Sequence, residues 1–179
     1  MAHRHPLPID PIAEAKRQWV EHGWAEAAVG MSAVASVMRA QQLMLSRTEA
    51  VLRPFGLSFA RFELLRLLAF SREGRMPMGS VGARLQVHPA SVTSTVQRLE
   101  RDGLVSREPH PRDGRSALLV LTDAGRSRIE EATAALNAGA FADVGLSEED
   151  TAELVRILAR LRKDAGDFAD PPAVPASLL

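Results

Sequence analysis

The 179-residue chain contains no cysteine and no tyrosine, and aromatic residues make up only 4% of it. Without cysteine, it can form no disulfide, no thiolate metal site and no thiol-based redox switch. No uninterrupted run of about 18 apolar residues occurs, so we expect no membrane span. The N-terminal sequence MAHRHPLPIDP places prolines and an acid where a signal peptide has its apolar stretch, and we therefore expect a cytoplasmic protein.

Charge is balanced overall but is unevenly distributed along the chain. The formal net charge is zero, with 22 basic and 22 acidic residues. Between Ser58 and Arg128, however, 12 arginines stand against 7 acidic residues, which leaves the rest of the chain with an excess of acid. A basic middle flanked by acidic ends is typical of a protein that binds phosphate groups, although chance clustering of surface arginines explains the same charge equally well.

Hydrophobic spacing and capping residues predict a mainly α-helical chain of about one domain's length. The expected helices cover residues 11–21, 24–52, 58–71, 78–85, 89–102, 122–143 and 147–163. Strand-forming residues at 104–107 and 116–121 flank the sequence EPHPRDG, which predicts a small β-hairpin with a basic tip. The sequence REGRMP, at residues 72–77, is expected to form a turn.

Helix, short helix, turn, helix and hairpin follow one another in the order of a winged helix-turn-helix, whose second helix enters the DNA major groove. In that helix, Val92, Val96 and Leu99 share one face and are expected to pack inward. The opposite face is small and hydroxyl-rich at its start and basic further on, and it comprises Ala90, Ser91, Ser94, Gln97, Arg98 and Arg101. Such groups suit phosphates and base edges, and the alternative interpretation is a plain solvated helix surface.

The hairpin tip carries two arginines, Arg112 and Arg115, where a turn could be made without them. An arginine-bearing tip suits a narrow minor groove, in which negative potential is concentrated. We expect Asp113 to orient one of these arginines through a salt bridge rather than to contact DNA. The alternative interpretation is a solvated turn that contacts no DNA.

The sequence LERDGLVSREPHPRDGRSALLVLTDAGR resembles the end of the recognition helix, the wing and the following helix start of the MarR family of bacterial regulators. The motifs that carry the resemblance are D-x-R-S, at Asp113, Arg115 and Ser116, and L-T-x-x-G, at Leu121, Thr122 and Gly125. The similarity extends back through GLSFARFELLRLL and covers about residues 52–128. The DNA contacts that the resemblance implies are Ser91, Thr93, Ser94, Arg98, Arg112 and Arg115.

The resemblance also implies an obligate homodimer, in which terminal helices interleave and two winged lobes bind a pseudo-palindrome. The long helix expected at 24–52 fits this arrangement, because so small a domain cannot bury its apolar stripe. The expected parts are a disordered N-terminus (1–9), N-terminal dimerisation helices (10–55), a winged helix-turn-helix DNA-binding lobe (56–122), C-terminal dimerisation helices (123–165) and a flexible tail (166–179).

These observations predict a sequence-specific DNA-binding transcriptional regulator, with repression as the default because a dimer on a promoter blocks polymerase. The alternative is a winged-helix protein-interaction module without specific DNA binding. No enzyme is expected, because the sequence has no G-x-S-x-G, no H-E-x-x-H, no P-loop and no dinucleotide fingerprint. No cofactor or metal is expected either, since no two of the five histidines are spaced i, i+4 on a helix.

Many MarR relatives bind a small molecule between the dimer helices and the DNA-binding lobe, which implies an effector pocket in this chain. The candidate wall residues are Trp19, Trp24, Met31, Met38, Phe62 and Arg66. Any effector is expected to be an organic anion or an aromatic acid. The alternative is that these side chains are core or dimer contacts.

Overall fold

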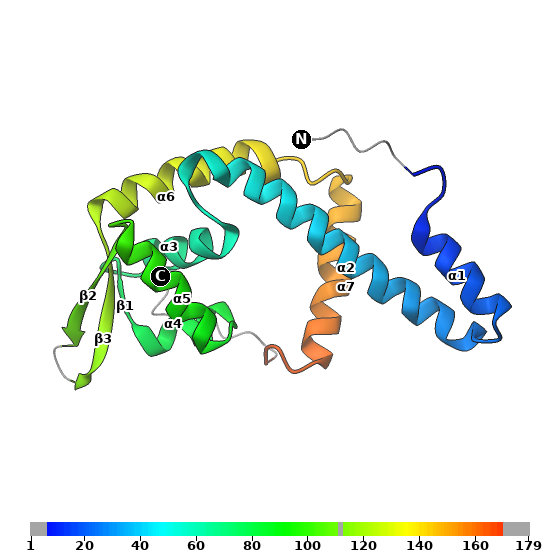
Figure 1. Cartoon of the computed structure of the whole chain (residues 1–179), viewed down its shortest axis with the longest axis horizontal. Helices are drawn as coiled ribbons and strands as arrows, with labels where there is room; N and C mark the ends of the chain where they lie inside the picture. The colour runs from blue at the N-terminus through cyan, green and yellow to red at the C-terminus, as the bar shows by residue number, and fades with distance from the viewer. Residues whose placement is uncertain (1–6, 111–112, 170–179) are drawn as a thin grey trace. The chain divides into compact units, whose positions relative to one another are not determined.

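The computed structural model describes residues 7–110 and 113–169, with the backbone only at residues 89, 110 and 113–116. Its helices are α1 (Pro11–Glu21), α2 (Ala25–Leu52), α3 (Phe59–Phe70), α4 (Met78–Leu85), α5 (Pro89–Arg101), α6 (Asp123–Leu136) and α7 (Glu148–Asp164) (Figure 1). A 3₁₀ turn at Arg53–Phe55 follows α2, and a π-helical segment at Asn137–Phe141 follows α6. The prediction of a mainly helical chain is confirmed.

The chain divides after Arg47 into two compact units, here called the N-terminal unit (described from residue 7) and the C-terminal unit (described to residue 169). The N-terminal unit contains α1 and the larger part of α2. Asp10 caps α1 by accepting a hydrogen bond from the Ile12 N–H (3.0 Å), and Pro11 fits the first helical position. No helix in the described ranges, α2 included, has both the length and the apolarity needed to cross a membrane.

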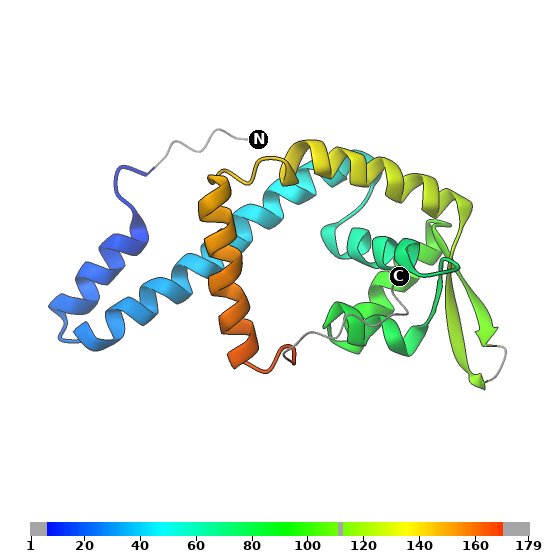
Figure 2. The ribbon, with the colours of Figure 1, turned by 180° about the vertical axis from the view of Figure 1, so that it is seen from behind.

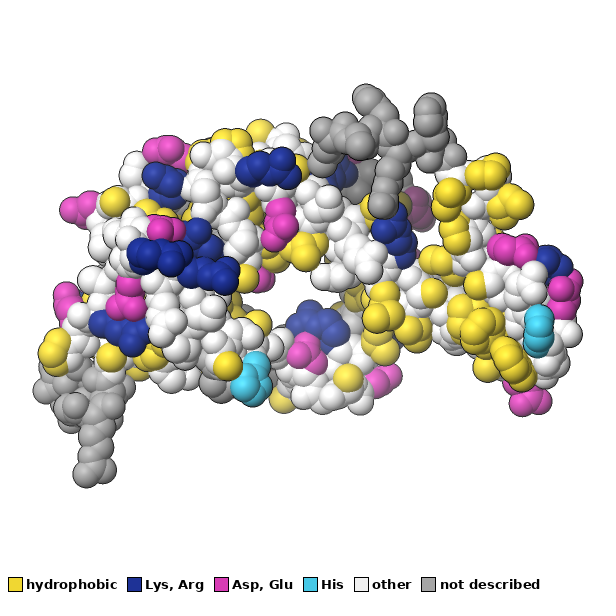
Figure 3. All heavy atoms as spheres, in the orientation of Figure 1, with side chains coloured by type: hydrophobic (Ala, Val, Ile, Leu, Met, Phe, Trp, Pro, Cys, Tyr) yellow, Lys and Arg dark blue, Asp and Glu magenta, His cyan; other side chains and the backbone are white. Residues whose placement is uncertain are grey.

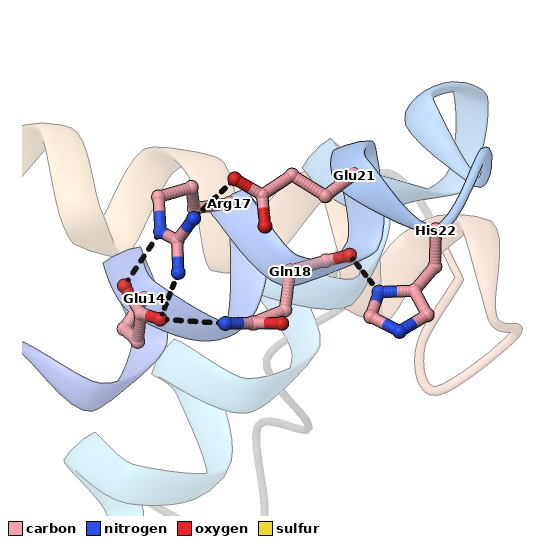
Figure 4. A network of polar contacts seen from close by, with 5 residues as sticks. All are labelled: Glu14, Arg17, Gln18, Glu21 and His22. Atoms are coloured by element: carbon pink, nitrogen blue, oxygen red, sulfur yellow. Dashed lines mark hydrogen bonds and ion pairs between the residues drawn. The ribbon is translucent and has the colours of Figure 1, made fainter.

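Arg17 is the centre of a polar network on the exposed side of α1 (Figure 4). Its guanidinium donates to Glu14 (Nε to Oε2, 2.9 Å) and also pairs with Glu21. Gln18 donates a second hydrogen bond to the Glu14 carboxylate (2.9 Å). The bonds from Arg17 and then Gln18 stabilise the ionised form, and they lower the pKa of Glu14 from 4.5 to about 2. These contacts are solvent-exposed pairs within one helix, and each is expected to add only a small amount to its stability.

The antiparallel sheet of the C-terminal unit has the order β1-β3-β2, formed by β1 (Arg75–Pro77), β2 (Val105–His110) and β3 (Asp113–Leu121). Strands β2 and β3 form the predicted hairpin. The prediction of a turn throughout 72–77 is wrong, because Arg75–Pro77 pairs with β3 and places Met76 opposite Leu119. Met76 is buried in the core. Pro77, which has no N–H to donate, is tolerated because β1 is an edge strand.

The core of the C-terminal unit is centred on α3, which contacts α4, α5, α6, β1 and β3. Ser58 caps α3 as predicted, since its hydroxyl accepts a hydrogen bond from the Arg61 N–H (3.3 Å). Three leucines of α3, Leu64, Leu65 and Leu68, are fully buried. These leucines lie on one side of α3, and the packing of the helix against α4, α5, α6 and the sheet supports the DNA-binding module (Figure 2).

The helix after the hairpin is shorter than the expected range of 122–143. Its α-helical part ends at Leu136, and the following π-helical segment is marked by the Ala142 N–H donating to the Asn137 carbonyl, five residues earlier (3.0 Å). The predicted cap residues are confirmed at both helices after the sheet. Thr122 accepts a hydrogen bond from the N–H of Gly125 (3.0 Å), and Ser147 accepts one from the N–H of Asp150 (3.1 Å).

Candidate nucleic-acid interface

A three-residue turn joins α4 to α5. Gln86 ends α4 with a left-handed backbone (φ 53°, ψ 36°), and its N–H donates to the Gly82 carbonyl. His88 begins α5, because its Nδ1 accepts a hydrogen bond from the Ala90 N–H (3.2 Å). This cap requires the ring tautomer in which Nδ1 carries no proton. The turn therefore redirects the chain sharply, as a helix-turn-helix requires.

Helix α5 has the two faces that its sequence predicts. Val92, Val96 and Leu99 are buried in the core. All of the predicted DNA contacts on this helix are exposed on the outward side, namely Ala90, Ser91, Thr93, Ser94, Gln97 and Arg98. Lys and Arg side chains gather over α5 in the space-filling view (Figure 3). The structure thus brings the predicted residues of α5 together on one accessible surface.

Two ion pairs fix the C-terminal end of α5, and sequence reasoning missed both. Arg61, at the start of α3, pairs with Asp102, and its Nη1 also donates to the Gly56 carbonyl (2.7 Å). Arg107 of β2 pairs with Glu100 (3.0 Å). These contacts join the recognition helix to α3 on one side and to the wing strand on the other. They orient α5 without using its outward face.

The L-T-x-x-G motif has a structural role at the joint between the sheet and α6. The Thr122 hydroxyl donates to the Gly103 carbonyl (2.8 Å) and accepts from the Gly125 N–H (3.0 Å). At Gly125, a Cβ atom would lie 2.0 Å from the Leu104 carbonyl oxygen, which leaves no room for any side chain. Thr122 and Gly125 therefore pin the start of α6 against the loop that leads from α5 into β2.

The predicted wing contacts fall where the structure gives no side chains. Arg112 lies outside the described residues, and Asp113 and Arg115 lie in β3 with only their backbone described. Within the hairpin, residue 110 pairs with residue 113 after a register irregularity that follows Pro109. The DNA contacts of Arg112 and Arg115, and the orienting role of Asp113, stay predictions.

The predicted effector residues belong to different units. Trp19 and Trp24 are in the N-terminal unit, with ring centroids 5.4 Å apart in an edge-to-face arrangement. Met38, in the same unit, is 62% exposed. In the C-terminal unit, Phe62 is buried in the core. Arg66 donates to the Glu130 carboxylate and to the Ile129 carbonyl (both 3.0 Å), so it ties α3 to α6. The effector pocket itself stays a prediction.

The chemistry that the α5 surface offers is that of hydrogen-bond donors and cations. Hydroxyl, amide and guanidinium groups follow one another along the exposed face, and the N-terminal end of a helix favours negative charge. In the described ranges, no group of three or more His, Asp or Glu side chains is placed to hold a metal ion. This surface therefore fits phosphates and base edges.

A helix-turn-helix with an outward basic helix, followed by a β-hairpin, defines a winged helix-turn-helix DNA-binding protein. The sequence model of the MarR family matches residues 55–116. Among solved structures, Sco5413, a MarR family transcriptional regulator from Streptomyces coelicolor, is 47% identical with a TM-score of 0.72, and the match covers 79% of this chain and 98% of that one. The chain belongs to the MarR family and is a DNA-binding transcriptional regulator.

Two curated proteins of Bacillus subtilis (strain 168) are similar in sequence. YdgJ, an uncharacterized HTH-type transcriptional regulator, is 35% identical over 116 residues, which are 63% of this chain and 68% of that protein. YetL, an HTH-type transcriptional repressor, is 36% identical over 76 residues, which are 42% of this chain and 46% of that protein. The similarity to YetL therefore spans less than half of the repressor's length.

Proposed function

We propose that the protein binds a pseudo-palindromic DNA operator as a homodimer and represses the promoter that contains it. The observation that carries the proposal is the exposed face of α5, whose opposite side is buried in the core. A helix fixed in this way can enter a major groove, which admits one α-helix. Repression is supported by the similarity to YetL, a repressor.

In this proposal, the outward side chains of α5 have different roles in DNA recognition. The proposed contacts are Ala90, Ser91, Thr93, Ser94, Gln97 and Arg98. The small residues at the start of the helix allow close approach, and their hydroxyls bind phosphates or base edges. Gln97 and Arg98 have the geometry for two-point contacts with adenine and guanine. Within the described part of the chain, Arg98 forms no side-chain hydrogen bond or ion pair that would compete with such a contact.

The wing is proposed to contact DNA beside the major-groove site. Arg112 and Arg115 would reach the adjacent minor groove, where a narrow A·T-rich stretch concentrates negative potential. Asp113 would orient one of them. Replacing both arginines with alanine should weaken operator binding strongly and leave the dimer intact. Unchanged operator affinity would mean that the wing does not contact DNA.

The proposed homodimer is supported by apolar side chains that stay exposed in the single chain. They lie on α2 (Val29, Val34, Val37, Met38, Leu43 and Met44) and on α7 (Val155, Ile157 and Leu161). Hydrophobic side chains are visible over the α1 and α2 part of the chain in Figure 3. A second copy of the chain, related by two-fold symmetry, would cover these exposed apolar side chains. We assign dimerisation to residues 10–55 and 123–165, and DNA binding to residues 56–122.

We further propose that a small effector releases the protein from its operator. The fluorescence of the two tryptophans provides an assay for effector binding. Trp19 and Trp24 are the only tryptophans of the chain. An aromatic acid bound near them should quench their fluorescence and weaken operator binding at the same concentration. Titration with a panel of phenolic acids measures both effects. Quenching without any loss of DNA affinity would mean that the ligand does not regulate the protein.

Selection of tight-binding duplexes from a random DNA pool, followed by anisotropy at several salt concentrations, tests the proposed function. We expect an enriched inverted repeat whose half-site centres lie about 34 Å apart. Affinity should fall steeply as salt rises, because the protein releases counterions from the phosphates that it contacts. Weak binding without an enriched sequence would instead support a winged-helix protein-interaction module.

A pair of arginine substitutions provides the matched control for that experiment. Arg98→Ala removes a cation from the outward face of α5, so operator affinity and base preference should both decline. Arg156→Ala removes a cation from α7, where it pairs with Glu153 of the same helix. It should leave the operator sequence and the salt dependence unchanged. Equal effects of the two substitutions would mean that charge in general, and not the α5 face, drives binding.

A further inference from the structure

Gln86, in the turn of the helix-turn-helix, has a backbone conformation that its residue type does not favour. Among the described residues, it is the only one other than glycine with a positive φ (53°). Glycine adopts this left-handed conformation readily, whereas a side chain makes it costly. A glutamine at this place therefore suggests that its side chain has a function that glycine cannot supply.

The side chain of Gln86 reaches the segment that follows α7. Its Nε2 donates a hydrogen bond to the backbone carbonyl of Asp167 (2.8 Å), 81 residues further along the chain. Both residues belong to the C-terminal unit. The contact joins the turn that precedes the recognition helix to the end of a helix that we assign to dimerisation.

The segment after α7 is ordered by its own contacts. Gly166 reverses the chain with a positive φ (76°). The Asp167 N–H donates to the Arg162 carbonyl (3.0 Å), and Arg162 Nε donates to the Asp167 carboxylate (2.6 Å). The Arg162 guanidinium also lies 5.5 Å from the centre of the Phe168 ring. Asp167 and Phe168 are half-buried, whereas the residues just before them are exposed. This turn therefore holds the Asp167 carbonyl in place for Gln86.

We propose that Gln86, Arg162, Asp167 and Phe168 form a clasp that holds the helix-turn-helix turn to the end of α7 and so sets the half-site spacing that the operator must have. The role in spacing rests on the proposed dimer. In the proposed dimer, α7 belongs to the part shared with the second copy, and α5 begins three residues after Gln86. A fixed link between them keeps the two recognition helices at a fixed separation. Gln86 is a positioning residue in this proposal and does not contact DNA.

Two substitutions open the clasp from opposite sides, and a third serves as the control. Gln86→Gly removes the amide and suits the left-handed turn better than glutamine does, so the fold should be preserved. Arg162→Ala removes the side-chain contacts to Asp167 and Phe168 and keeps only the backbone hydrogen bond from the Asp167 N–H. Arg156→Ala removes an arginine of the same helix whose partner, Glu153, lies outside the clasp. All three are made in the full-length chain.

Hydrogen–deuterium exchange tests the clasp without reference to DNA or to the dimer. Arg162→Ala should speed amide exchange in residues 86–92 by about three- to tenfold, the range that the net free energy of one hydrogen bond allows. Arg156→Ala should leave that segment unchanged. If Arg162→Ala also leaves it unchanged, the segment after α7 does not restrain the turn, and the proposal is overturned.

Operators with one base pair added or removed between the half-sites test the role in spacing. The wild type should bind the selected spacing best, and Gln86→Gly should lose about three- to tenfold there but discriminate less among spacings. Gln86→Gly and Arg162→Ala should be non-additive, whereas Gln86→Gly and Arg156→Ala should add. A wild-type spacing profile in Gln86→Gly would overturn the proposal. If the wild type neither dimerises nor selects an operator, the proposed function fails, while the exchange experiment still decides the clasp.

Discussion

The two units of the chain differ in how much apolar surface they bury by themselves. In the C-terminal unit, leucines from α3, α5, β3 and α6 are completely buried, and they form one continuous core. In the N-terminal unit, Ala28 is the one buried residue among those described, and Val29, Val34 and Met38 are each more than 60% exposed. The core of the C-terminal unit is therefore complete within one chain, although α7 keeps apolar side chains exposed. The N-terminal unit leaves most of its apolar side chains uncovered, which is the surface that our proposed dimer would bury.

Because of this difference, the stability of the two units has different sources. The free energy that holds the DNA-binding lobe comes from burial within the chain and does not depend on protein concentration. In our proposal, the apolar side of α2 is removed from water by association with a second copy. The stability that this burial provides therefore varies with protein concentration, as it does wherever folding is coupled to dimerisation. In our proposal, the recognition helix therefore stays folded whether or not the two copies are associated.

The largest effect is expected from a cavity in the C-terminal unit. Leu99 is fully buried behind the recognition face of α5, so Leu99→Ala should lower the free energy of unfolding by about 2–5 kcal/mol. Leu43→Ala removes the same atoms from an exposed position on α2. Urea denaturation at two protein concentrations measures both. The loss in Leu99→Ala should be the same at each concentration, and that in Leu43→Ala should change with concentration. Equal, concentration-independent losses would show that α2 is buried within its own chain.

The inward face of α5 could be predicted because the information is local. Val92, Val96 and Leu99 recur at spacings of four and three, and a helix places such positions on one side whatever surrounds it. The caps at Ser58, Thr122 and Ser147 are local in the same sense, since each acceptor oxygen bonds an N–H three residues ahead. The predicted contact face of α5 follows from the same periodicity.

The features that the sequence did not reveal depend on residues far apart in the chain. Strand β1 has one buried side chain, Met76, and exists because β3 pairs with it more than forty residues later. The Arg61–Asp102 pair joins residues 41 positions apart, and nothing in the local pattern distinguishes Arg61 from other surface arginines. Gln86 likewise resembles any polar turn residue until its partner at the end of α7 is known.

Alanine substitution of two helical glycines should change stability in opposite directions. Gly125→Ala places a Cβ atom 2.0 Å from the Leu104 carbonyl oxygen, and we expect a loss of about 1–3 kcal/mol as α6 moves away from the sheet. Gly30→Ala adds a methyl group on α2 where nothing lies within 4 Å. It should stabilise the helix by about 0.5–1 kcal/mol. Thermal melts followed by circular dichroism measure both changes, and destabilisation by Gly30→Ala would place Gly30 in a tightly packed dimer contact.

A charge on the exposed side of α2 should separate association from folding. Val34 is 61% exposed in the single chain, so Val34→Asp should leave the C-terminal unit folded. In the dimer, however, an unpaired carboxylate would be buried, and the dissociation constant should rise more than tenfold. Sedimentation velocity measures the dimer, and Glu26→Asp on the same helix is the control that adds no charge. A dimer that tolerates Val34→Asp would place the interface on another part of the chain.

The smallest effect concerns acid and is confined to α1. The pKa of Glu14 is lowered to about 2 by Arg17 and Gln18, so the stability that this carboxylate contributes is complete above about pH 4.5 and is lost as the pH falls towards 2. Both tryptophans lie in the N-terminal unit. Tryptophan fluorescence should therefore show an acid transition that becomes weaker in Glu14→Gln.

A second acidic pair makes this test specific to one unit. Arg156 donates a hydrogen bond to Glu153 on α7 and lowers its pKa in the same way, but the C-terminal unit contains no tryptophan. Glu153→Gln should therefore leave the fluorescence transition as it is in the wild type. If it alters that transition as much as Glu14→Gln does, the acid response belongs to the whole molecule, and the two units do not respond to acid separately. If Glu14→Gln has no effect, the Arg17 network does not stabilise α1.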